Sequence, residues 1–268
     1  YSSPSLSNGV LFVGGGGKML FAIEALTGKE VWKTELPKTL SHQPVISDGK
    51  VFVHNDVFVG AYNAKNGKEI WRIAFWPSAC SGSVPIVVGD LILFGANDKH
   101  FYALNVKNGK EVWKFKASGN FDTSPVAVEG VVYVGNRNSH LYALDLAKGT
   151  KIWSKKASGT NGVRSPAYHD GIVYAGTSAG KLHAYKAKDG KEVWVKDGLG
   201  AVYACSTVYD GNVYVGSYAS KYYAMDLKDG TLKWAFRAGR LFNGCGAAAK
   251  GKIFFVARDG FFYMVDSK

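Results

Sequence analysis

Short apolar runs separated by polar turns extend along the whole chain. In one typical stretch, apolar runs at 124–128, 131–135 and 140–145 alternate with turns at 129–130, 136–139 and 148–149. Runs of this length, rich in β-branched and aromatic residues and bounded by Gly, Asn or Asp, are typical of short antiparallel strands. A fourth run opens at Thr150, and the sequence shows no 3.6-residue helical periodicity. The pattern therefore predicts an all-β chain built from units of four strands.

The same short phrase closes six successive units. It reads GKEVW at 28–32, 109–113 and 190–194, GKEIW at 67–71, GTKIW at 149–153 and GTLKW at 230–234. The six tryptophans follow one another at intervals of 39, 42, 40, 41 and 40 residues: Trp32, Trp71, Trp113, Trp153, Trp194 and Trp234. An alanine stands six residues before each glycine: Ala22, Ala61, Ala103, Ala143, Ala184 and Ala224. A period of about 40 residues with four strands in each unit predicts a β-propeller.

Each recurring residue has a mechanical role in such a blade. The alanine keeps strand three small where neighbouring blades press together. The glycine is expected to supply the positive φ of a two-residue hairpin turn. The tryptophan ring covers the adjoining blade, and its N–H is expected to reach a backbone acceptor. We therefore interpret the six tryptophans as an architectural girdle and not as ligand-stacking residues.

A seventh unit begins at Leu241 and reaches Lys268 without a Gly-x-x-x-Trp phrase. We predict a seven-bladed β-propeller of four-stranded antiparallel blades, the last of which lacks its outer strand in this chain. The missing strand is expected from residues that precede Tyr1, and a genuine three-stranded blade is the alternative. Residues 1–268 are predicted to form a single domain. Its blades are expected at about 1–39, 40–79, 80–120, 121–160, 161–201, 202–240 and 241–268.

Composition and charge narrow the classes of function. The 268 residues are 47% apolar and 14% aromatic, which excludes a disordered chain. No apolar run approaches the roughly 18 residues of a membrane span, so no transmembrane segment is expected. Lys and Arg outnumber Asp and Glu by 33 to 21, and this net charge of +12 favours acidic partners. Nucleic-acid binding is not expected, because many lysines recur in the turn of each blade (Lys29, Lys68, Lys110, Lys191) instead of forming one stripe.

The chain contains three cysteines, Cys80, Cys205 and Cys245. They are too few and too scattered for a disulfide framework or a zinc site. Cys205 and Cys245 occupy matching positions in strand one of two adjacent blades. A disulfide requires Cα atoms within about 7 Å, a distance that we do not expect between these strands. We therefore predict two reduced thiols that line the central channel.

The repeat resembles the pyrroloquinoline-quinone (PQQ)-type repeat. Its clearest copies are 124–153 and 205–234, where Val213-Tyr214-Val215-Gly216 is followed by Tyr223-Ala224-Met225-Asp226 and Trp234. The resemblance implies a PQQ-like β-propeller, a fold with two kinds of member. One kind comprises the quinoprotein alcohol dehydrogenases, eight-bladed enzymes that hold the quinone and a calcium ion. The other comprises non-catalytic propellers, such as the lipoprotein of the outer-membrane β-barrel assembly machine and sensor domains of membrane kinases.

The residues that the resemblance implies for a dehydrogenase are mostly missing. Adjacent cysteines that would lie beside the quinone do not occur in this sequence. A calcium site requires several converging oxygen ligands, and Asp122 is nearly alone among carboxylates at the starts of strand one. We therefore predict a protein that is not an enzyme, with no cofactor and no metal site.

Two sets of loops are expected to meet on one face of the propeller: those that enter strand one and those between strands two and three. Cations and histidines, His54 among them, outnumber carboxylates in these loops. The candidate binding residues are His42, Trp76, His100, Arg137, His140, Arg164, Lys181, Tyr203, Lys221 and Arg258. Trp76 is the only tryptophan outside the girdle, and it is expected either to be buried or to anchor a partner. His100 and His140 share one register, but a common metal would require a third ligand that the sequence does not supply.

These features favour a non-enzymatic scaffold or binding module that presents a basic loop face to a protein partner. The resemblance implies a place outside the cytoplasm, in the periplasm or at the cell surface, and we expect a monomer. The first alternative is an extracytoplasmic sensor or binding domain for an acidic glycan or small ligand. The second alternative is a truncated PQQ-dependent dehydrogenase.

Overall fold

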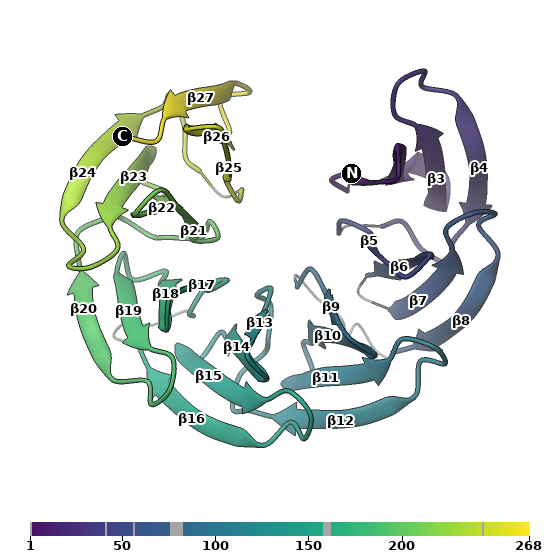
Figure 1. Cartoon of the computed structure of the whole chain (residues 1–268), viewed down its shortest axis with the longest axis horizontal. Helices are drawn as coiled ribbons and strands as arrows, with labels where there is room; N and C mark the ends of the chain where they lie inside the picture. The colour runs from purple at the N-terminus through teal and green to yellow at the C-terminus, as the bar shows by residue number, and fades with distance from the viewer. Residues whose placement is uncertain (1, 41, 56, 76–82, 158–161, 243) are drawn as a thin grey trace. The chain divides into compact units, whose positions relative to one another are not determined.

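The chain folds into antiparallel meander sheets throughout (Figure 1). The computed structural model describes residues 2–40, 42–55, 57–75, 83–157, 162–242 and 244–268. Within these ranges it contains six four-stranded sheets and a final three-stranded sheet, and consecutive strands are hydrogen-bonded neighbours in each. The prediction of an all-β, seven-bladed propeller whose last blade lacks its outer strand is confirmed.

The chain divides into two compact units, Tyr1–Ser124 and Pro125–Lys268. The first unit contains blades one to three. Blade one comprises β1 (Ser5–Ser7), β2 (Val10–Gly15), the 3-10 turn η1 (Gly16–Lys18), β3 (Met19–Glu24) and β4 (Glu30–Glu35). Blade two comprises β5 (Val45–Ser47), β6 (Lys50–His54), β7 (Phe58–Asn63) and β8 (Glu69–Ala74). Blade three comprises β9 (Ile86–Val88), β10 (Leu91–Gly95), β11 (His100–Asn105) and β12 (Glu111–Lys116).

The second unit contains blades four to seven. Blade four comprises β13 (Val126–Val128), β14 (Val131–Gly135), β15 (His140–Asp145) and β16 (Lys151–Lys156). Blade five comprises β17 (Ala167–His169), β18 (Ile172–Gly176), β19 (Leu182–Lys186) and β20 (Glu192–Lys196). Blade six comprises β21 (Thr207–Tyr209), β22 (Asn212–Gly216), β23 (Lys221–Asp226) and β24 (Leu232–Arg237). Blade seven comprises β25 (Ala247–Ala249), β26 (Lys252–Val256) and β27 (Phe262–Asp266). That the whole chain is one domain stays a prediction.

Two kinds of turn connect the strands within a blade. In every blade except blade three, the turn between strands one and two has positive φ at both central residues, as at Glu129 (51°) and Gly130 (76°), which is the type I′ geometry of a two-residue hairpin. The turn between strands three and four is longer than predicted. In blade two the Asn63 amide donates to the Lys68 carbonyl (2.8 Å), so four residues, and not two, lie between the paired ends. Gly67 still supplies a positive φ of 71° there.

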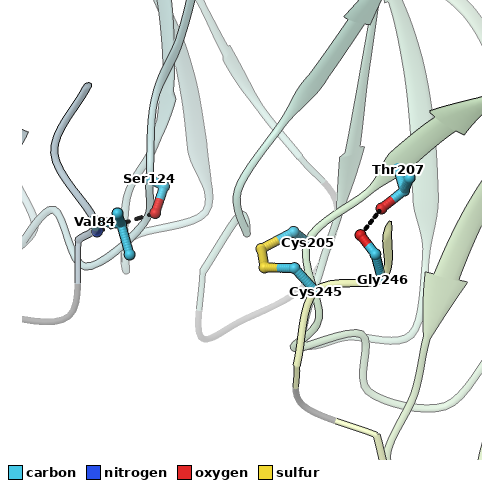
Figure 2. Close-up of a disulfide and its surroundings, with 6 residues drawn as sticks. All are labelled: Val84, Ser124, Cys205, Thr207, Cys245 and Gly246. Atoms are coloured by element: carbon cyan, nitrogen blue, oxygen red, sulfur yellow. Dashed lines mark hydrogen bonds between the residues drawn. A yellow bond between two sulfur atoms is a disulfide. The ribbon is translucent and has the colours of Figure 1, made fainter. Parts of the chain in front are cut away.

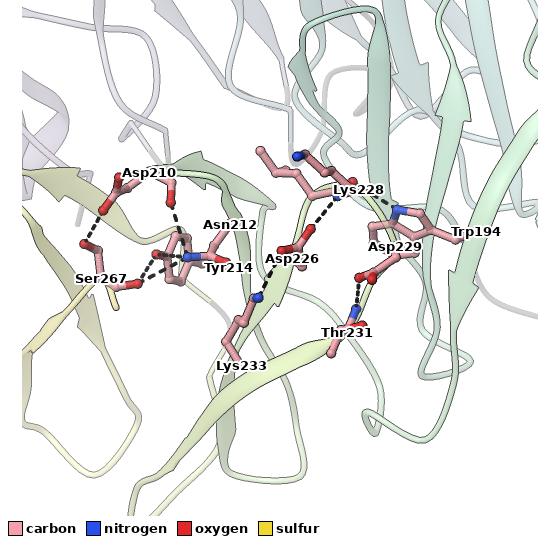
Figure 3. Close-up of polar contacts among 11 residues, drawn as sticks. Trp194, Asp210, Asn212, Tyr214, Asp226, Lys228, Asp229, Thr231, Lys233 and Ser267 are labelled. Atoms are coloured by element: carbon pink, nitrogen blue, oxygen red, sulfur yellow. Dashed lines mark hydrogen bonds and ion pairs between the residues drawn. The ribbon is translucent and has the colours of Figure 1, made fainter.

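The tryptophan of one blade docks on the turn of the next. The indole Nε1 of Trp71 donates to the Val106 carbonyl (3.0 Å), and that of Trp194 to the Leu227 carbonyl (3.0 Å; Figure 3). Trp32 and Trp153 make the same bond to Ala64 (2.9 Å) and Ala187 (2.7 Å). The girdle that the sequence predicts is therefore present at these interfaces.

The last interface differs from the others. Against blade seven, the buried Nε1 of Trp234 has no hydrogen-bond partner among the described atoms. The end of the chain supplies polar contacts at this interface: the Ser267 carbonyl accepts from the Tyr214 hydroxyl (2.6 Å), and the Ser267 hydroxyl donates to Asp210 (3.1 Å; Figure 3). The described residues include no helix with the length and hydropathy of a membrane span.

Cys205 and Cys245 form a disulfide, with their Cα atoms 4.8 Å apart (Figure 2). The prediction of two reduced thiols is therefore wrong. The cysteines lie just before β21 and β25, and these neighbouring strands approach closely enough for Thr207 Oγ1 to donate to the Gly246 carbonyl (3.0 Å). The Cα separation falls within the range of roughly 4.4 to 6.8 Å that a disulfide spans. The sequence gives the matching positions but not this approach of the two strands.

Candidate functional site

The two predicted loop sets meet at the junctions between blades. The loop that enters strand one of a blade donates a backbone hydrogen bond to the loop between strands two and three of the preceding blade. Val163 N donates to Asn136 O, and Val202 N to Thr177 O, both at 3.0 Å. Strand two ends in glycine at these junctions, because a Cβ at Gly135 would lie 2.5 Å from the Val163 carbonyl oxygen. These contacts fix the positions from which the candidate side chains project.

Blades five and six bring an arginine and two tyrosines together. The Arg164 guanidinium carbon lies 4.1 Å from the centroid of the Tyr203 ring, and the rings of Tyr203 and Tyr218 are 4.3 Å apart. Arg164 enters strand one of blade five, Tyr203 enters strand one of blade six, and Tyr218 follows β22. We call these three residues the Arg164–Tyr203–Tyr218 stack. Two of its members, Arg164 and Tyr203, are residues that the sequence nominated.

A salt bridge borders the loops that carry the stack. Lys181 Nζ lies 3.2 Å from Asp197 Oδ2, and the Leu199 amide donates to the Gly180 carbonyl (3.0 Å). The Gly198 amide and the Lys181 ammonium hold the pKa of the Asp197 carboxyl below its ordinary value. Asp197 is therefore ionised at neutral pH and pairs with Lys181 next to the segment that leads to Tyr203.

Three further predicted cations belong to the same unit. Arg137 is exposed in the loop between β14 and β15, Lys221 begins β23, and Arg258 is exposed between β26 and β27. Residues 125–268 contain 20 Lys and Arg against 11 Asp and Glu, whereas residues 1–124 contain 13 against 10. The positive charge of the chain is therefore concentrated in the second unit.

Two of the three nominated histidines contact backbone carbonyls of their own loops. His100 Nδ1 lies 3.1 Å from the Asp98 carbonyl oxygen, and His140 Nδ1 lies 2.8 Å from the Asn138 carbonyl oxygen. His42 lies before β5, with its ring 5.4 Å from that of His54. Trp76 lies outside the described residues. Whether any of the nominated residues binds a ligand stays a prediction.

His54 is not the loop residue that the sequence suggested. It ends β6 and is 1% exposed, and neither ring nitrogen has a hydrogen-bond partner among the described atoms. It occupies the strand-two position that Gly95 and Gly135 fill in blades three and four. Burial, and next the neighbouring His42, lower the pKa of His54 to about 3. His54 is therefore a neutral core residue at neutral pH.

Two residues of the site, Tyr218 and Asp197, are not among the candidates predicted from the sequence. Tyr218 is 40% exposed and packs against Tyr203, and Asp197 holds Lys181. The signal for Tyr218 is an aromatic residue in the polar loop Ser217-Tyr218-Ala219-Ser220. Asp197 directly follows β20, the strand that contains Trp194, and no sequence motif marks it as a site residue.

This arrangement is suited to recognition. An arginine presents N–H donors in a planar fork that matches a carboxylate, and half-exposed tyrosines supply rigid apolar contact area. The described residues contain no group of three or more His, Cys, Asp or Glu side chains placed to hold a metal ion.

Comparison with known proteins identifies the family. A family model described as "Outer membrane protein assembly factor BamB" matches residues 2–72 and 55–197. The chain belongs to this family. None of the curated proteins matches the sequence.

Solved structures with the same fold include both kinds of PQQ-repeat protein. BamB from Moraxella catarrhalis is 18% identical, with a TM-score of 0.86 over 98% of this chain and 84% of that one. A europium-containing methanol dehydrogenase is 16% identical, with a TM-score of 0.77 over 98% of this chain and 72% of that one. Quinohemoprotein alcohol dehydrogenase ADHIIG from Pseudomonas putida HK5 is 15% identical, with a TM-score of 0.77 over 95% of this chain and 62% of that one. At these identities the likeness shows a common fold.

Proposed function

We propose that this chain is a non-catalytic scaffold that binds an acidic segment of a protein partner through the Arg164–Tyr203–Tyr218 stack. The observation that carries the proposal is the stack itself, a cation held 4.1 Å from one tyrosine ring that packs against a second. Aromatic residues and arginine dominate the binding energy of protein interfaces. The excess of cations in residues 125–268 would steer an acidic partner toward this part of the chain.

The family supports a class of partner for this role, and the disulfide supports a cellular location. The family description names outer-membrane protein assembly, so we infer that the partner is a protein of that process. Disulfides persist in oxidising compartments such as the bacterial periplasm. The Cys205–Cys245 bond therefore supports a location outside the cytoplasm.

The test is site-specific photo-crosslinking in a cell-envelope extract of the source organism. A photo-reactive phenylalanine derivative replaces Tyr218 in one protein and Val193 in a control. Both positions are similarly exposed, at 40% and 43%, but Val193 lies on β20, away from the stack. We expect one discrete adduct at position 218 that weakens about tenfold with Arg164→Glu and disappears in high salt. Adducts of equal yield at both positions would contradict the proposal. An adduct at position 218 whose yield Arg164→Glu does not lower would also contradict it.

A further inference from the structure

Surface grooves lie between neighbouring blades of the second unit. The groove between blades four and five has a volume of about 410 Å³, and its walls include Val131, Ile152, Tyr168, Ile172 and Lys186. We call it the blade four–five groove. The equivalent groove between blades five and six has a volume of about 580 Å³. The residues that line both grooves belong to one compact unit, so each groove is defined within that unit alone.

The floor of the blade four–five groove is apolar and accessible. Ile152 is 48% exposed, and Tyr168 and Ile172 are partly exposed. The Tyr168 ring stacks on the Tyr133 ring, with centroids 6.2 Å apart and planes inclined by 14°. The Tyr133 hydroxyl in turn donates to the Ala187 carbonyl (3.2 Å). Contacts within the fold therefore hold this apolar surface in place.

One wall of the groove departs from the repeat. In four other blades the last residue of strand three is Asn or Asp, and its side-chain oxygen accepts from the amide two residues ahead, at 2.8–2.9 Å: Asn63, Asn105, Asp145 and Asp226. Blade five has Lys186 at this position, whose amide donates to the Lys191 carbonyl as the Asp226 amide donates to the Thr231 carbonyl, both at 2.8 Å. Because a lysine side chain has no acceptor, this turn lacks the side-chain bond. A local rule that is broken without benefit to the fold indicates a functional position.

Two exposed lysines of this wall, Lys186 and Lys188, are not paired with a carboxylate within the described ranges. In blade three the residue equivalent to Lys188 is Lys107, whose Nζ lies 3.3 Å from Asp90 Oδ1. Gly171 takes the place of Asp90 in blade five, since the Ala187 amide donates to Gly171 O as the Val106 amide donates to Asp90 O. The two ammonium groups are therefore available to a ligand.

The groove between blades five and six has the opposite balance of charge. Its lining contains two carboxylates, Asp170 and Asp226, and one ammonium group, Lys228. Asp226 ends strand three there and pairs with Lys233 (3.0 Å; Figure 3). The lining of the blade four–five groove contains two ammonium groups and one carboxylate, Glu129. The two grooves lie at equivalent places in the repeat and differ in charge, so the second serves as an internal control.

We propose that the blade four–five groove binds an extended acidic segment of another polypeptide, in which an aliphatic or aromatic residue is flanked by Asp or Glu. The apolar side chain packs on Ile152 and Tyr168, and a flanking carboxylate pairs with Lys186 and Lys188. The volume of the groove lies within the range of roughly 300–1,000 Å³ that is typical of ligand sites. An apolar anchor supplies binding energy, and complementary charge supplies specificity.

This site is independent of the Arg164–Tyr203–Tyr218 stack. The groove lies beside the turns that precede strand two and follow strand three, whereas the stack lies among the loops that follow strand two. The two sites are therefore at opposite ends of the strands, and each can be tested while the other is intact.

The probe is a synthetic hexapeptide, Gly-Asp-Phe-Leu-Asp-Gly, acetylated at its N-terminus and amidated at its C-terminus. It is titrated into the isotope-labelled chain 1–268 and followed by NMR. We expect saturable shifts of the amides of residues 129–133 and 186–188, and no shifts at 226–228 in the control groove. A peptide with Lys in place of both Asp residues, or with Ser in place of Phe and Leu, should bind at least about tenfold more weakly.

Matched variants separate binding from folding. Lys186→Asp restores the residue type of the repeat, so we expect the affinity to fall at least about tenfold while thermal stability is unchanged or higher. Lys148→Asp makes the same change of charge at an exposed lysine outside the groove and should leave the affinity unchanged. Glu129→Gln removes the carboxylate from the lining and should strengthen binding about twofold. Arg164→Glu, in the stack, should have no effect.

Four results would overturn the proposal. The first is the absence of shifts in the groove at millimolar peptide, including the case in which short-chain phosphatidylglycerol shifts the same amides and the occupant is a lipid. The second is an equal affinity of the Lys186→Asp and Lys148→Asp variants. The third is a set of shifts confined to the stack and abolished by Arg164→Glu. The fourth is a concentration-dependent shift of the groove amides in the unliganded chain, because the occupant would then be a second copy.

Discussion

A single glycine at the end of strand two decides how closely successive blades pack. A Cβ at Gly95 would lie 2.6 Å from the Phe121 carbonyl oxygen, and the backbone cannot yield because it belongs to the hydrogen-bonded junction of Phe121 with Ala96. We expect Gly95→Ala to destabilise the fold by about 2 kcal/mol through overpacking. Urea unfolding measures the effect. Gly244→Ala, at a site with nothing within 4 Å, should change stability by less than about 0.5 kcal/mol.

His54 makes stability depend on pH. Its pKa of about 3 in the folded chain lies below the ordinary value of 6.5, so between these values the unfolded chain binds the proton and the folded chain does not. Stability should therefore fall as the pH is lowered through this window, by up to about 1.4 kcal/mol per pH unit. His54→Gln should remove this contribution from the slope, whereas His169→Gln, at an exposed histidine, should leave it. An unchanged slope for His54→Gln would contradict this account, because it would mean that folding does not lower the pKa of His54.

Blade seven is stabilised by fewer strand contacts than the other blades. It has three strands, its β27 exposes Phe262 (68%) and Met264 (58%), and the Trp234 Nε1 beside it has no described partner. The Cys205–Cys245 disulfide and the contacts of Ser267 hold it to blade six. The bond closes a loop of 40 residues, which constrains the unfolded chain.

Loss of the disulfide should loosen this blade first. We expect the double substitution Cys205→Ser/Cys245→Ser to lower the free energy of unfolding by about 2–4 kcal/mol. In hydrogen exchange, the amides of β26 and β27 should lose protection, while those of β6 and β7 keep theirs. Uniform loss of protection across all blades would contradict a local role for the bond.

The elements were predictable because their signals are local and repeated. The GKEVW phrases fix the period, and the Gly and Asn or Asp residues mark the turns within each blade. The disulfide was not predictable, because it depends on how closely β21 and β25 approach. The burial of His54 follows from its place in the register of strand two. Tyr218 is recognised as a site residue only from its contact with Tyr203. The disulfide and the contacts between blades therefore depend on distances that the sequence pattern does not predict.

For the whole molecule, the fold alone does not decide the function. The same fold serves BamB and two alcohol dehydrogenases, so fold similarity supports both the scaffold and the enzyme interpretations. The basic and aromatic stack in blades five and six favours recognition of a protein. The absence of adjacent cysteines in the sequence removes one feature that the resemblance implies for the enzymes.

The most direct test of the scaffold interpretation is thermal unfolding of the chain with and without PQQ and Ca²⁺. A ligand at about 100 times its dissociation constant adds roughly 2.7 kcal/mol to the stability of the fold that binds it. For a chain of this size that corresponds to a rise in Tm of several degrees. Our account predicts no change in Tm. A saturable rise that requires both PQQ and Ca²⁺ would contradict it and would identify the chain as a quinone-binding propeller.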